Sequence, residues 1–169
     1  MAPPSREHEV LTWEAFGAAA RELAQRVRDD GFDPTIVLAV ARGGLPVAGA
    51  VAYALGVKNC CVINVEYYTD IDERLEVPII LPPALNLVDL TAARVLVVDD
   101  VADTGETLKL VADQVATYVA EVRTAVLYEK PRSIVQCDYV WASTSHWIDF
   151  PWSVLDAVSE VRSRNVEPE

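Results

Sequence analysis

The chain has 169 residues, a length that fits one domain with a hydrophobic core and leaves little room for a second. Hydrophobic residues make up 51% of it, a share that excludes intrinsic disorder for the chain as a whole. The formal net charge of -12 disfavours nonspecific binding to nucleic acid, because such binding relies on a basic surface. An anionic ligand would have to be bound by focused positive groups, by backbone N–H groups or by a cation.

The sequence carries no signal for a membrane or for export. No apolar run reaches the roughly 18 residues that a membrane span needs, and the start MAPPSREHEV lacks the basic and apolar regions of a signal peptide. Cys60, Cys61 and Cys137 form neither a disulfide framework nor a zinc-ligand spacing. We therefore expect a cytoplasmic protein with reduced cysteines and no membrane partner.

The first expected element is a helix. We expect residues 1–10 to form a loose N-terminal segment and the helix to begin after Thr12, whose side chain suits an N-cap. Apolar residues recur at helical spacing from Trp13 to Val27, and Gly31 is the expected stop. These signals predict one helix between Thr12 and Gly31.

A strand–helix–strand unit follows. Residues 36–40 (IVLAV) form a short apolar strand that leads into a turn at residues 41–44 (ARGG). A helix is expected from about residue 45 to residue 55, ending at Gly56, and CCVINV at residues 60–65 is the second strand. Because both strands are apolar throughout, they indicate a parallel sheet that is covered on both faces.

The pattern then breaks at a polar stretch, residues 66–76 (EYYTDIDERLE), which is too charged for a core and predicts a mobile loop or an exposed hairpin. A strand at residues 95–98, a turn at 99–105 and a helix at about 106–118 come next. A strand at residues 122–128 completes a second strand–helix–strand unit.

The last expected strand is DYVWA at residues 138–142, and the aromatic segment HWIDFPW lies near the end of the chain. The order of elements predicts an α/β fold in a single domain, residues 1–169, with a mainly parallel sheet and helices on both faces. In such sheets ligands bind beyond the carboxyl ends of the strands, where both glycine-containing turns lie.

The segment VLVVDDVADTGETL, residues 95–108, carries the strongest chemical signal. It places two adjacent carboxylates and then a third after an apolar strand, and it opens a helix with Thr-Gly-Glu-Thr. Backbone N–H groups and hydroxyls at a helix N-terminus suit a phosphate. The paired carboxylates suit sugar hydroxyls or a hydrated magnesium ion.

This segment also has simpler interpretations. Asp and Thr can merely cap a helix after a buried strand, but three acids with Thr-Gly-x-Thr fit that reading poorly. No G-x-x-x-x-G-K-[ST] and no G-x-G-x-x-G occurs anywhere, so a P-loop and a dinucleotide fingerprint are excluded. The acids also lack the Asp-x-Asp spacing of a haloacid-dehalogenase-like phosphatase.

Residues 95–108 resemble the signature of type I phosphoribosyltransferases that binds 5-phosphoribosyl pyrophosphate (PRPP). VARGGL at residues 40–45, Glu129-Lys130-Pro131 and WIDFPW at residues 147–152 narrow the resemblance to purine enzymes like the bacterial xanthine-guanine and archaeal ones. The similarity covers nearly the whole chain, from Leu11 to Trp152. It implies a type I phosphoribosyltransferase fold and a magnesium-dependent transfer from PRPP to a purine base.

The resemblance implies a PRPP site in which Asp99 and Asp100 bind the ribose hydroxyls, with magnesium bridging them to PRPP. Asp103 would lie near the purine N7 and share its proton. Arg42, which a cis peptide bond would precede, would hold the pyrophosphate. The simpler interpretation of Arg42 is a surface arginine on a turn. The implied PRPP-binding residues are Ala41, Arg42, Gly43, Asp99, Asp100, Ala102, Asp103, Thr104, Gly105, Glu106 and Thr107. The glycines at residues 43–44 would allow the close approach.

The polar stretch matches the flexible hood of this family, here residues 66–78, with Arg74 as the expected contact to pyrophosphate. Closure of a hood excludes water from a reactive sugar centre. Two departures stand out: Tyr67 takes the place of a Ser that relatives often have, and Glu106 stands where many relatives carry Gly or a basic residue. We expect Glu106 to point away from the phosphate, because an inward carboxylate would repel it.

The base would be recognised within residues 129–152. Lys130 is a pure hydrogen-bond donor, so it complements an O6 acceptor and clashes with the amino group of adenine. Trp147 would stack on the purine and the backbone of Ile148 would read the ring edge, unless Trp147 is a core aromatic. His146 is expected to be a surface or supporting residue rather than a catalyst.

Asp103, Arg42 and Arg74 are thus the expected catalytic residues, with Mg²⁺ as cofactor and PRPP and an oxopurine as substrates. Two rival functions stay open: a PRPP-binding regulator without turnover, and an enzyme of the same fold for another base. A regulator usually needs a basic surface or a DNA-binding domain, and this acidic chain shows neither. By analogy we expect a homodimer or a higher homo-oligomer.

Overall fold

A computed structural model describes residues 7–66, 69–70, 73–74, 79–81 and 90–158, and from Glu66 to Leu81 it describes the backbone alone. The elements in chain order are β1 (His8–Val10), α1 (Trp13–Asp29), β2 (Ile36–Ala41), α2 (Gly44–Leu55), β3 (Cys60–Glu66), β4 (Thr69–Asp70), β5 (Glu73–Arg74), β6 (Ile79–Leu81), β7 (Arg94–Ala102), α3 (Glu106–Ala116), β8 (Glu121–Glu129), β9 (Tyr139–Ser143) and β10 (Trp147–Asp149). The expectations for Tyr67, for residues 1–6 and for residues 75–78 lie outside the described residues.

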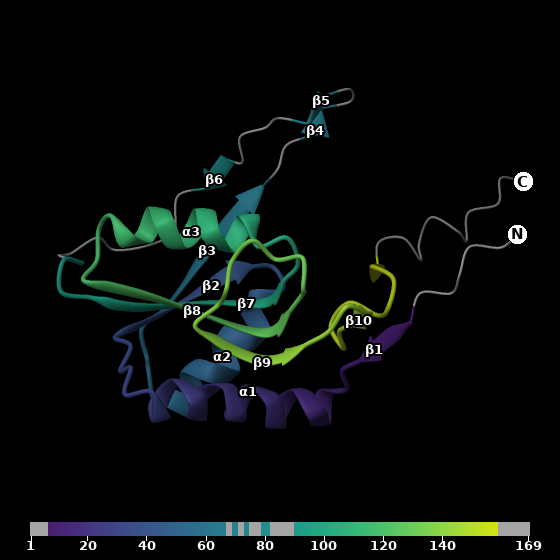
Figure 1. The fold of residues 1–169 in the computed structure, drawn as a ribbon, viewed down its shortest axis with the longest axis horizontal. Coiled ribbons are helices and arrows are strands. Elements are labelled where there is room, and N and C mark those ends of the chain that lie inside the picture. Colours follow the sequence, from purple (N-terminus) through teal and green to yellow (C-terminus); the bar gives the residue numbers. More distant parts are fainter. Residues whose placement is uncertain (1–6, 67–68, 71–72, 75–78, 82–89, 159–169) are drawn as a thin grey trace, which may run out of the picture.

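The main sheet has six strands in the order β6-β3-β2-β7-β8-β9. All neighbours in it are parallel except β6, which runs antiparallel to β3. Helix α3 covers one face of the sheet, whereas α1 and α2 cover the other (Figure 1). The predicted α/β fold with helices on both faces is confirmed, and β6 is an antiparallel addition that the sequence did not indicate.

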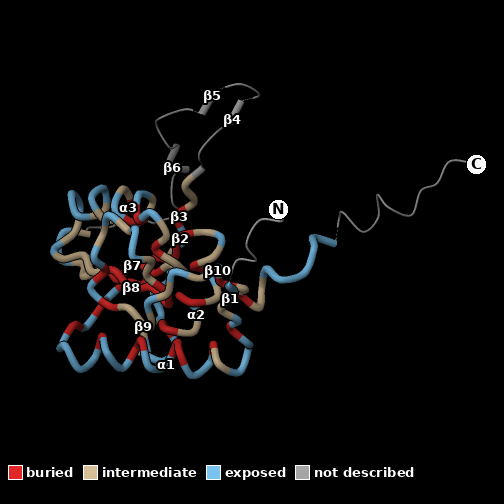
Figure 2. The backbone as a smooth tube through the Cα atoms, turned by 45° about the vertical axis from the view of Figure 1, so that its right-hand side comes forward, coloured by how far each residue is buried: buried red, intermediate tan, exposed pale blue. Residues whose placement is uncertain are grey.

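Alternate residues of each apolar strand face opposite layers, which explains why these strands lack polar positions. In β2, Val37 and Ala39 pack with α1 and α2, whereas Ile36, Leu38 and Val40 pack with α3. Figure 2 shows the buried positions concentrated in the strands and on the inner sides of the helices. Two apolar cores, one on each face, therefore hold the sheet between its helices.

The helix ends follow the predicted signals. Thr12 is the N-cap of α1, and its Oγ1 accepts a 3.1 Å hydrogen bond from the N–H of Ala15. Gly31 follows the end of α1 with φ 77°, and Gly56 caps α2 with φ 75°. Both glycines adopt the left-handed conformation that ends helices, which other residues adopt at a cost.

The N-terminal segment departs from expectation. Residues 8–10, predicted to be loose, form β1 and pair in parallel with β10, with His8 opposite Trp147. Backbone bonds from Trp147 N–H to the Glu7 carbonyl (3.1 Å) and from Leu11 N–H to the Asp149 carbonyl (3.1 Å) flank this pair. The prediction of a loose segment is therefore wrong for these three residues, because their partner lies far away in the sequence.

Strand β7 is longer than predicted. The expected turn at residues 99–105 begins only after Ala102, because β8 continues to pair with β7 as far as Ala102 opposite Glu129. The pairing overrides the low strand propensity of two adjacent aspartates. Asp99 and Asp100 consequently lie within a strand rather than in a flexible turn.

Two further elements bear on the predictions. Helix α3 ends at Ala116, two residues before the predicted end, where Thr117 Oγ1 donates to the carbonyl of Gln114 at 2.8 Å. Within the expected hood, Thr69 pairs antiparallel with Arg74 in the short ladder of β4 and β5. Among the helices of the described residues, none is both long and apolar enough to cross a membrane.

Candidate functional site

The carboxyl ends of β2, β7 and β8 meet at one edge of the sheet, because these three strands are parallel neighbours. Each strand delivers part of the expected site there: the turn after Ala41, the acids of β7, and Lys130 just beyond β8. Ligands of open α/β sheets bind at this edge. The topology thus collects motifs that are far apart in the sequence.

The turn after β2 presses its backbone against β7. The peptide bond between Ala41 and Arg42 is cis, as the resemblance implied. A Cβ at Gly43 would lie 2.6 Å from Asp100 Oδ1 and nearer still to Oδ2, and a Cβ at Gly44 would lie 2.5 Å from the Val98 carbonyl oxygen. Glycine is thus the residue that fits at both positions against β7, while the expected close approach of the pyrophosphate stays a prediction.

Arg42 itself is exposed, and its guanidinium forms no ion pair with any residue in the described part of the chain. The simpler reading of a surface Arg and the expected pyrophosphate contact both agree with this placement. The side chain of Arg74 lies outside the description, so only its backbone position in β5 is known.

Asp99 and Asp100 are half-buried neighbours at the end of β7, and the N–H of Asp100 donates to Asp99 Oδ1 at 2.9 Å. Burial raises the pKa of Asp99 well above its usual value, and the Asp100 carboxylate raises it further. Burial also raises the pKa of Asp100, against the lowering effect of hydrogen bonds from the Val101 N–H, from Asp99 and from Trp152. Two such carboxylates favour a cation or hydroxyl donors beside them.

Carboxylate oxygens are donors of the kind that Mg²⁺ prefers, so the pair fits this ion chemically. No group of three or more His, Cys, Asp or Glu side chains gathers as a metal site within the residues that the structure describes. A magnesium ion here would therefore complete its coordination with water and with oxygens of a bound phosphate compound, as is usual for Mg²⁺.

The loop that enters α3 is shaped by Gly105, which has φ 80° and is the N-cap residue of the helix. A Cβ at Gly105 would lie 2.5 Å from Ser133 Oγ, so the loop packs tightly against the segment after β8. Thr104 and Glu106 are exposed and Ala102 is buried. The N–H of Glu106 donates to Thr104 Oγ1 at 3.4 Å, and the N-terminus of a helix is a place where an anion is favoured.

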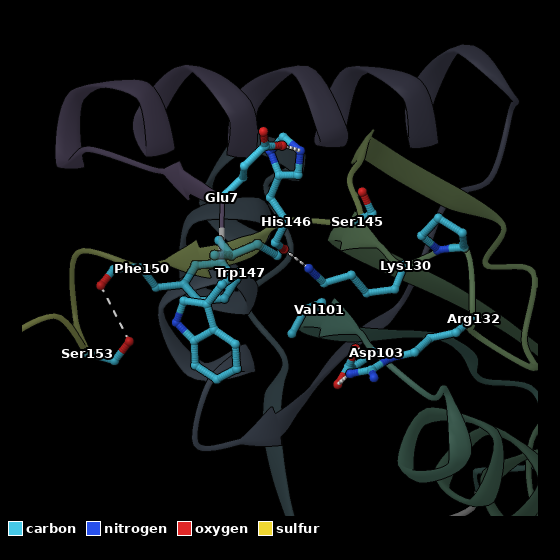
Figure 3. A pocket seen from close by; sticks show the side chains of 12 residues that line it. Glu7, Val101, Asp103, Lys130, Arg132, Ser145, His146, Trp147, Phe150 and Ser153 are labelled. Carbon is cyan, nitrogen blue, oxygen red and sulfur yellow. Dashed lines mark hydrogen bonds and ion pairs between the residues drawn. The ribbon is translucent and has the colours of Figure 1, made fainter. Parts of the chain in front are cut away.

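A pocket of about 690 Å³ lies beside this loop (Figure 3). Its lining includes four expected site residues: Asp103, Lys130, Trp147 and Ile148. The complete lining is Glu7, Val101, Asp103, Lys130, Pro131, Arg132, Ser145, His146, Trp147, Ile148, Phe150 and Ser153. The described structure thus brings the expected base-recognition residues together with the third carboxylate, while Arg42, Asp99 and Asp100 lie outside this lining.

Lys130 reaches from the end of β8 into the pocket, where its Nζ donates to the backbone carbonyl of His146. Desolvation lowers the pKa of Lys130, and the charge of Asp103 partly opposes this effect. An ammonium has three N–H donors, so the bond to His146 leaves donors for a ligand.

Asp103 has a partner that sequence reasoning missed. Arg132 Nε donates to Asp103 Oδ1 at 2.9 Å, and a terminal nitrogen of the same guanidinium donates to Oδ2. This hydrogen bonding raises the pKa of Arg132. The sequence shows only that Arg132 lies two residues after Lys130 in the turn that leaves β8, and its contact with Asp103 depends on the register between two loops.

The aromatic residues of the last segment separate into two roles. Trp147 is 56% exposed at the pocket, which argues against a core position, whereas Ile148 is 8% exposed. Trp152 stacks on Phe150 with ring centroids 5.0 Å apart and belongs to the aromatic packing. His146 Nε2 lies 2.9 Å from Glu7 Oε2, in keeping with a supporting residue, and Glu7 is a further lining residue that the sequence did not indicate.

The chain is similar to known proteins over nearly all of the residues described above. The family model of the phosphoribosyl transferase domain matches residues 7–157. The xanthine-guanine phosphoribosyltransferase of Ruegeria sp. is 30% identical over 155 residues, which cover 85% of this chain and 84% of the relative. The crystal structure of a purine phosphoribosyltransferase from Pyrococcus horikoshii superposes with a TM-score of 0.76 at 35% identity, covering 89% and 97% of the two chains.

A lower similarity supports the fold alone. The xanthine-guanine-hypoxanthine phosphoribosyltransferase of Helicobacter pylori is 22% identical and superposes with a TM-score of 0.76, covering 93% of this chain and 99% of its own.

The family model spans both glycine-containing turns, the acids of β7 and the whole pocket lining. The chain belongs to the phosphoribosyl transferase domain family.

Proposed function

We propose that this protein transfers the 5-phosphoribosyl group of PRPP to N9 of a 6-oxopurine, with release of pyrophosphate, in purine salvage. The observation that carries the proposal is the pocket in which an ammonium, a carboxylate and an exposed indole meet beside the phosphate-type loop. The names of the relatives, xanthine-guanine and purine phosphoribosyltransferases, agree with it. Hypoxanthine, guanine and xanthine are the substrates considered, because all three carry O6.

PRPP binds along the carboxyl edge of the sheet. Asp99 and Asp100 accept hydrogen bonds from the ribose hydroxyls, and the loop from Ala102 to Thr107 surrounds the 5-phosphate with backbone N–H groups. Arg42 extends from the turn after β2 to the pyrophosphate, where its exposed guanidinium is available. Glu106 is exposed in the first turn of α3, and its carboxylate stays turned toward solvent.

Mg²⁺ is the expected cofactor, held by Asp99 and Asp100 through water and PRPP oxygens. When bound, it supplies positive charge that neutralises the departing pyrophosphate. The two half-buried carboxylates and their raised pKa values support this assignment, since a nearby cation would favour their ionised forms.

The purine lies in the pocket on the exposed face of Trp147. Lys130 donates to O6 with a proton that the His146 carbonyl does not occupy, and the backbone of Ile148 lies at the ring edge. Adenine has a donor amino group at this position, so the Lys130 ammonium would be left without an acceptor. This geometry favours oxopurines over adenine.

The reaction exchanges one bond at the sugar carbon C1′. The bond from C1′ to the pyrophosphate oxygen breaks as the bond from C1′ to N9 forms, and Asp103 accepts the proton that leaves N7. Arg42 stabilises the charge of the departing pyrophosphate. The expected hood, which lies largely outside the described residues, would close over the centre with Arg74 and exclude water. A cytoplasmic location and a homo-oligomeric assembly complete the proposal by analogy with the family.

The test is to incubate the protein with PRPP, Mg²⁺ and each of hypoxanthine, guanine, xanthine and adenine, and to measure nucleotide formation. We expect turnover with at least one oxopurine and little with adenine. PRPP binding without turnover on any base would contradict the proposal and favour a regulator of the same fold. Preferred use of adenine would contradict the role of Lys130.

A further inference from the structure

The turn that follows β8 is bonded to the loop that precedes α3 at two points. The N–H of Lys130 donates to the carbonyl of Ala102 at 3.0 Å, and the N–H of Ile134 donates to the carbonyl of Thr104 at 2.8 Å. The turn is closed internally by the N–H of Ser133, which donates to the Lys130 carbonyl at 3.0 Å. These backbone bonds fix the register of residues 130–134 against residues 102–104.

This register sets Arg132 opposite Asp103. Figure 3 shows the two side chains meeting at one side of the pocket, with Lys130 above them. Nε and one terminal nitrogen of the guanidinium donate to the two oxygens of the carboxylate, so the contact is bidentate. A bidentate contact fixes the plane of a carboxylate as well as its position.

The contact leaves Asp103 able to act on a ligand. An ionised carboxylate offers about four acceptor sites, and the guanidinium uses one on each oxygen. Both oxygens remain acceptors with a further site each, which is the state that can take a proton from a ring N–H. Arg132 therefore holds Asp103 without exhausting its acceptor capacity.

The geometry matters because O6 and N7 are neighbours on one edge of a 6-oxopurine. A base whose O6 lies at Lys130 presents N7 at a fixed distance from it, so the Asp103 carboxylate must keep its place relative to Lys130. One short turn carries Lys130 and Arg132, and both side chains line the same pocket. The spacing between the O6 donor and the N7 acceptor thus depends on the bonds that join this turn to the loop of Asp103.

We propose that Arg132 is a positioning residue: its guanidinium holds the carboxylate of Asp103 in one orientation as the acceptor for the N7 proton. This role rests on the proposed function. Arg132 acts through Asp103 and contributes to the chemical step, while PRPP binds independently of it. The opposite arrangement, in which Arg132 blocks Asp103 and must leave when the base arrives, predicts the opposite effect of removing Arg132.

Stability and catalysis can be separated for this residue. The side chains of Arg132 and Asp103 are 68% and 45% exposed. Exposed ion pairs contribute little to the stability of a fold. An Arg132→Gln variant should therefore unfold at nearly the same temperature as the unsubstituted protein, and a change in turnover would report on the site alone.

The experiment is a double-mutant cycle with Arg132→Gln, Asp103→Asn and the double variant, measured as kcat and as KM for PRPP and for the best oxopurine. Arg28→Gln is the matched control, because Arg28 is an exposed arginine paired with Asp33 outside the pocket lining. We expect Arg132→Gln to lower kcat about tenfold, a fraction of what a positioned general base contributes, with KM for PRPP changed less than about twofold. In the Asp103→Asn background the same substitution should change kcat by less than about twofold.

The possible outcomes distinguish the positioning role from the alternatives. The positioning role would be overturned if Arg132→Gln had the same kcat as the unsubstituted protein, a higher kcat, or tighter base binding. It would also be overturned if Arg132→Gln lowered kcat as much in the Asp103→Asn background as in the unsubstituted protein. Failure of the unsubstituted protein to turn over any base would instead overturn the proposed function, and the positioning role with it. A large fall in unfolding temperature for Arg132→Gln would show a structural role and likewise overturn the proposal.

Discussion

The backbone of Gly43 lies directly against the carboxylate of Asp100, although the two residues come from different strand ends. A Cβ at position 43 would lie 2.6 Å from Asp100 Oδ1, so the space for a side chain is already filled by the acid. The turn that carries Arg42 and the pair of acids in β7 therefore form one packed unit, in which a change on one side moves the other.

Gly43→Ala should impair the PRPP site. The added methyl group must displace Asp100 or shift the turn, and overpacking of this kind costs roughly 1–3 kcal/mol. We expect weaker PRPP binding and lower turnover, measured by calorimetric titration with PRPP and Mg²⁺ and by nucleotide formation. Gly49→Ala is the control: it lies in α2 with nothing within 4 Å of its Cβ, and it should stabilise the protein slightly. Equal PRPP affinity in the two variants would contradict the prediction.

The raised pKa of Asp99 predicts a pH-dependent cost to stability. Burial and the neighbouring Asp100 raise this pKa above the unfolded value, so between the two values the folded protein binds more protons than the unfolded chain. Stability from this group is therefore lost as pH rises from about 4, the unfolded value, through the folded one. Asp99→Asn removes the charge and keeps an oxygen that can accept the Asp100 N–H.

We expect Asp99→Asn to have a higher Tm than the unsubstituted protein at neutral pH, with a difference that grows as pH rises above about 4. Thermal unfolding at a series of pH values measures this difference. Asp113→Asn serves as the control, because the Asp113 carboxylate is 64% exposed on α3. A Tm difference that stays constant across the series, or that shrinks with rising pH, would refute the argument from burial.

Lys130→Ala tests recognition of the base. Lys130 is the ammonium in the pocket that we assign to O6, and truncation leaves that acceptor without a charged donor. A lost hydrogen bond to a charged group costs about 1.5–3 kcal/mol, so we expect KM for the oxopurine to rise roughly 10–100-fold. KM for PRPP should change little. Lys109→Ala, which removes an exposed lysine on α3, is the matched control. Unchanged base kinetics in Lys130→Ala would exclude the O6 assignment.

Much of the fold was predictable because its signals are local. A few consecutive residues are enough to recognise the apolar runs of β2, β3, β7 and β8 and the glycines that follow α1 and α2. The parallel order then follows from the strand–helix–strand units, and it brings Asp103 and Lys130 to one edge. Strand β1 was missed because three residues gain their structure only from β10, more than a hundred residues later.

Within the site, the residue types that bear chemistry were predictable and their partners were not. Asp103, Lys130 and Trp147 were identified from motifs, and the structure places all three in one pocket. Arg132 was missed because a turn residue has no periodicity, and its contact with Asp103 depends on the register between two loops. A sequence pattern fixes which groups are present, whereas their hydrogen-bond partners depend on tertiary packing.

The two tryptophans of the last segment should respond in opposite ways to truncation. Trp152 stacks on Phe150 at 5.0 Å and meets Phe16 edge to face at 5.2 Å, so Trp152→Ala leaves a gap in the aromatic packing. We expect it to destabilise the protein by about 2 kcal/mol, less than the 3–5 kcal/mol of a fully buried Trp because Trp152 is only half-buried. For a chain of this size that corresponds to a fall in Tm of roughly 4–8 °C.

Trp147 is 56% exposed and lines the pocket, so we expect little packing to be lost when its side chain is removed. Trp147→Ala should keep its Tm within about 2 °C of the unsubstituted protein. Its KM for the oxopurine should rise roughly tenfold, because a stacked base contributes about 1–3 kcal/mol by alanine substitution. Thermal unfolding and steady-state kinetics on both variants measure the contrast. A large loss of Tm in Trp147→Ala with unchanged base kinetics would make Trp147 a structural residue, and the base would then have to bind without its indole.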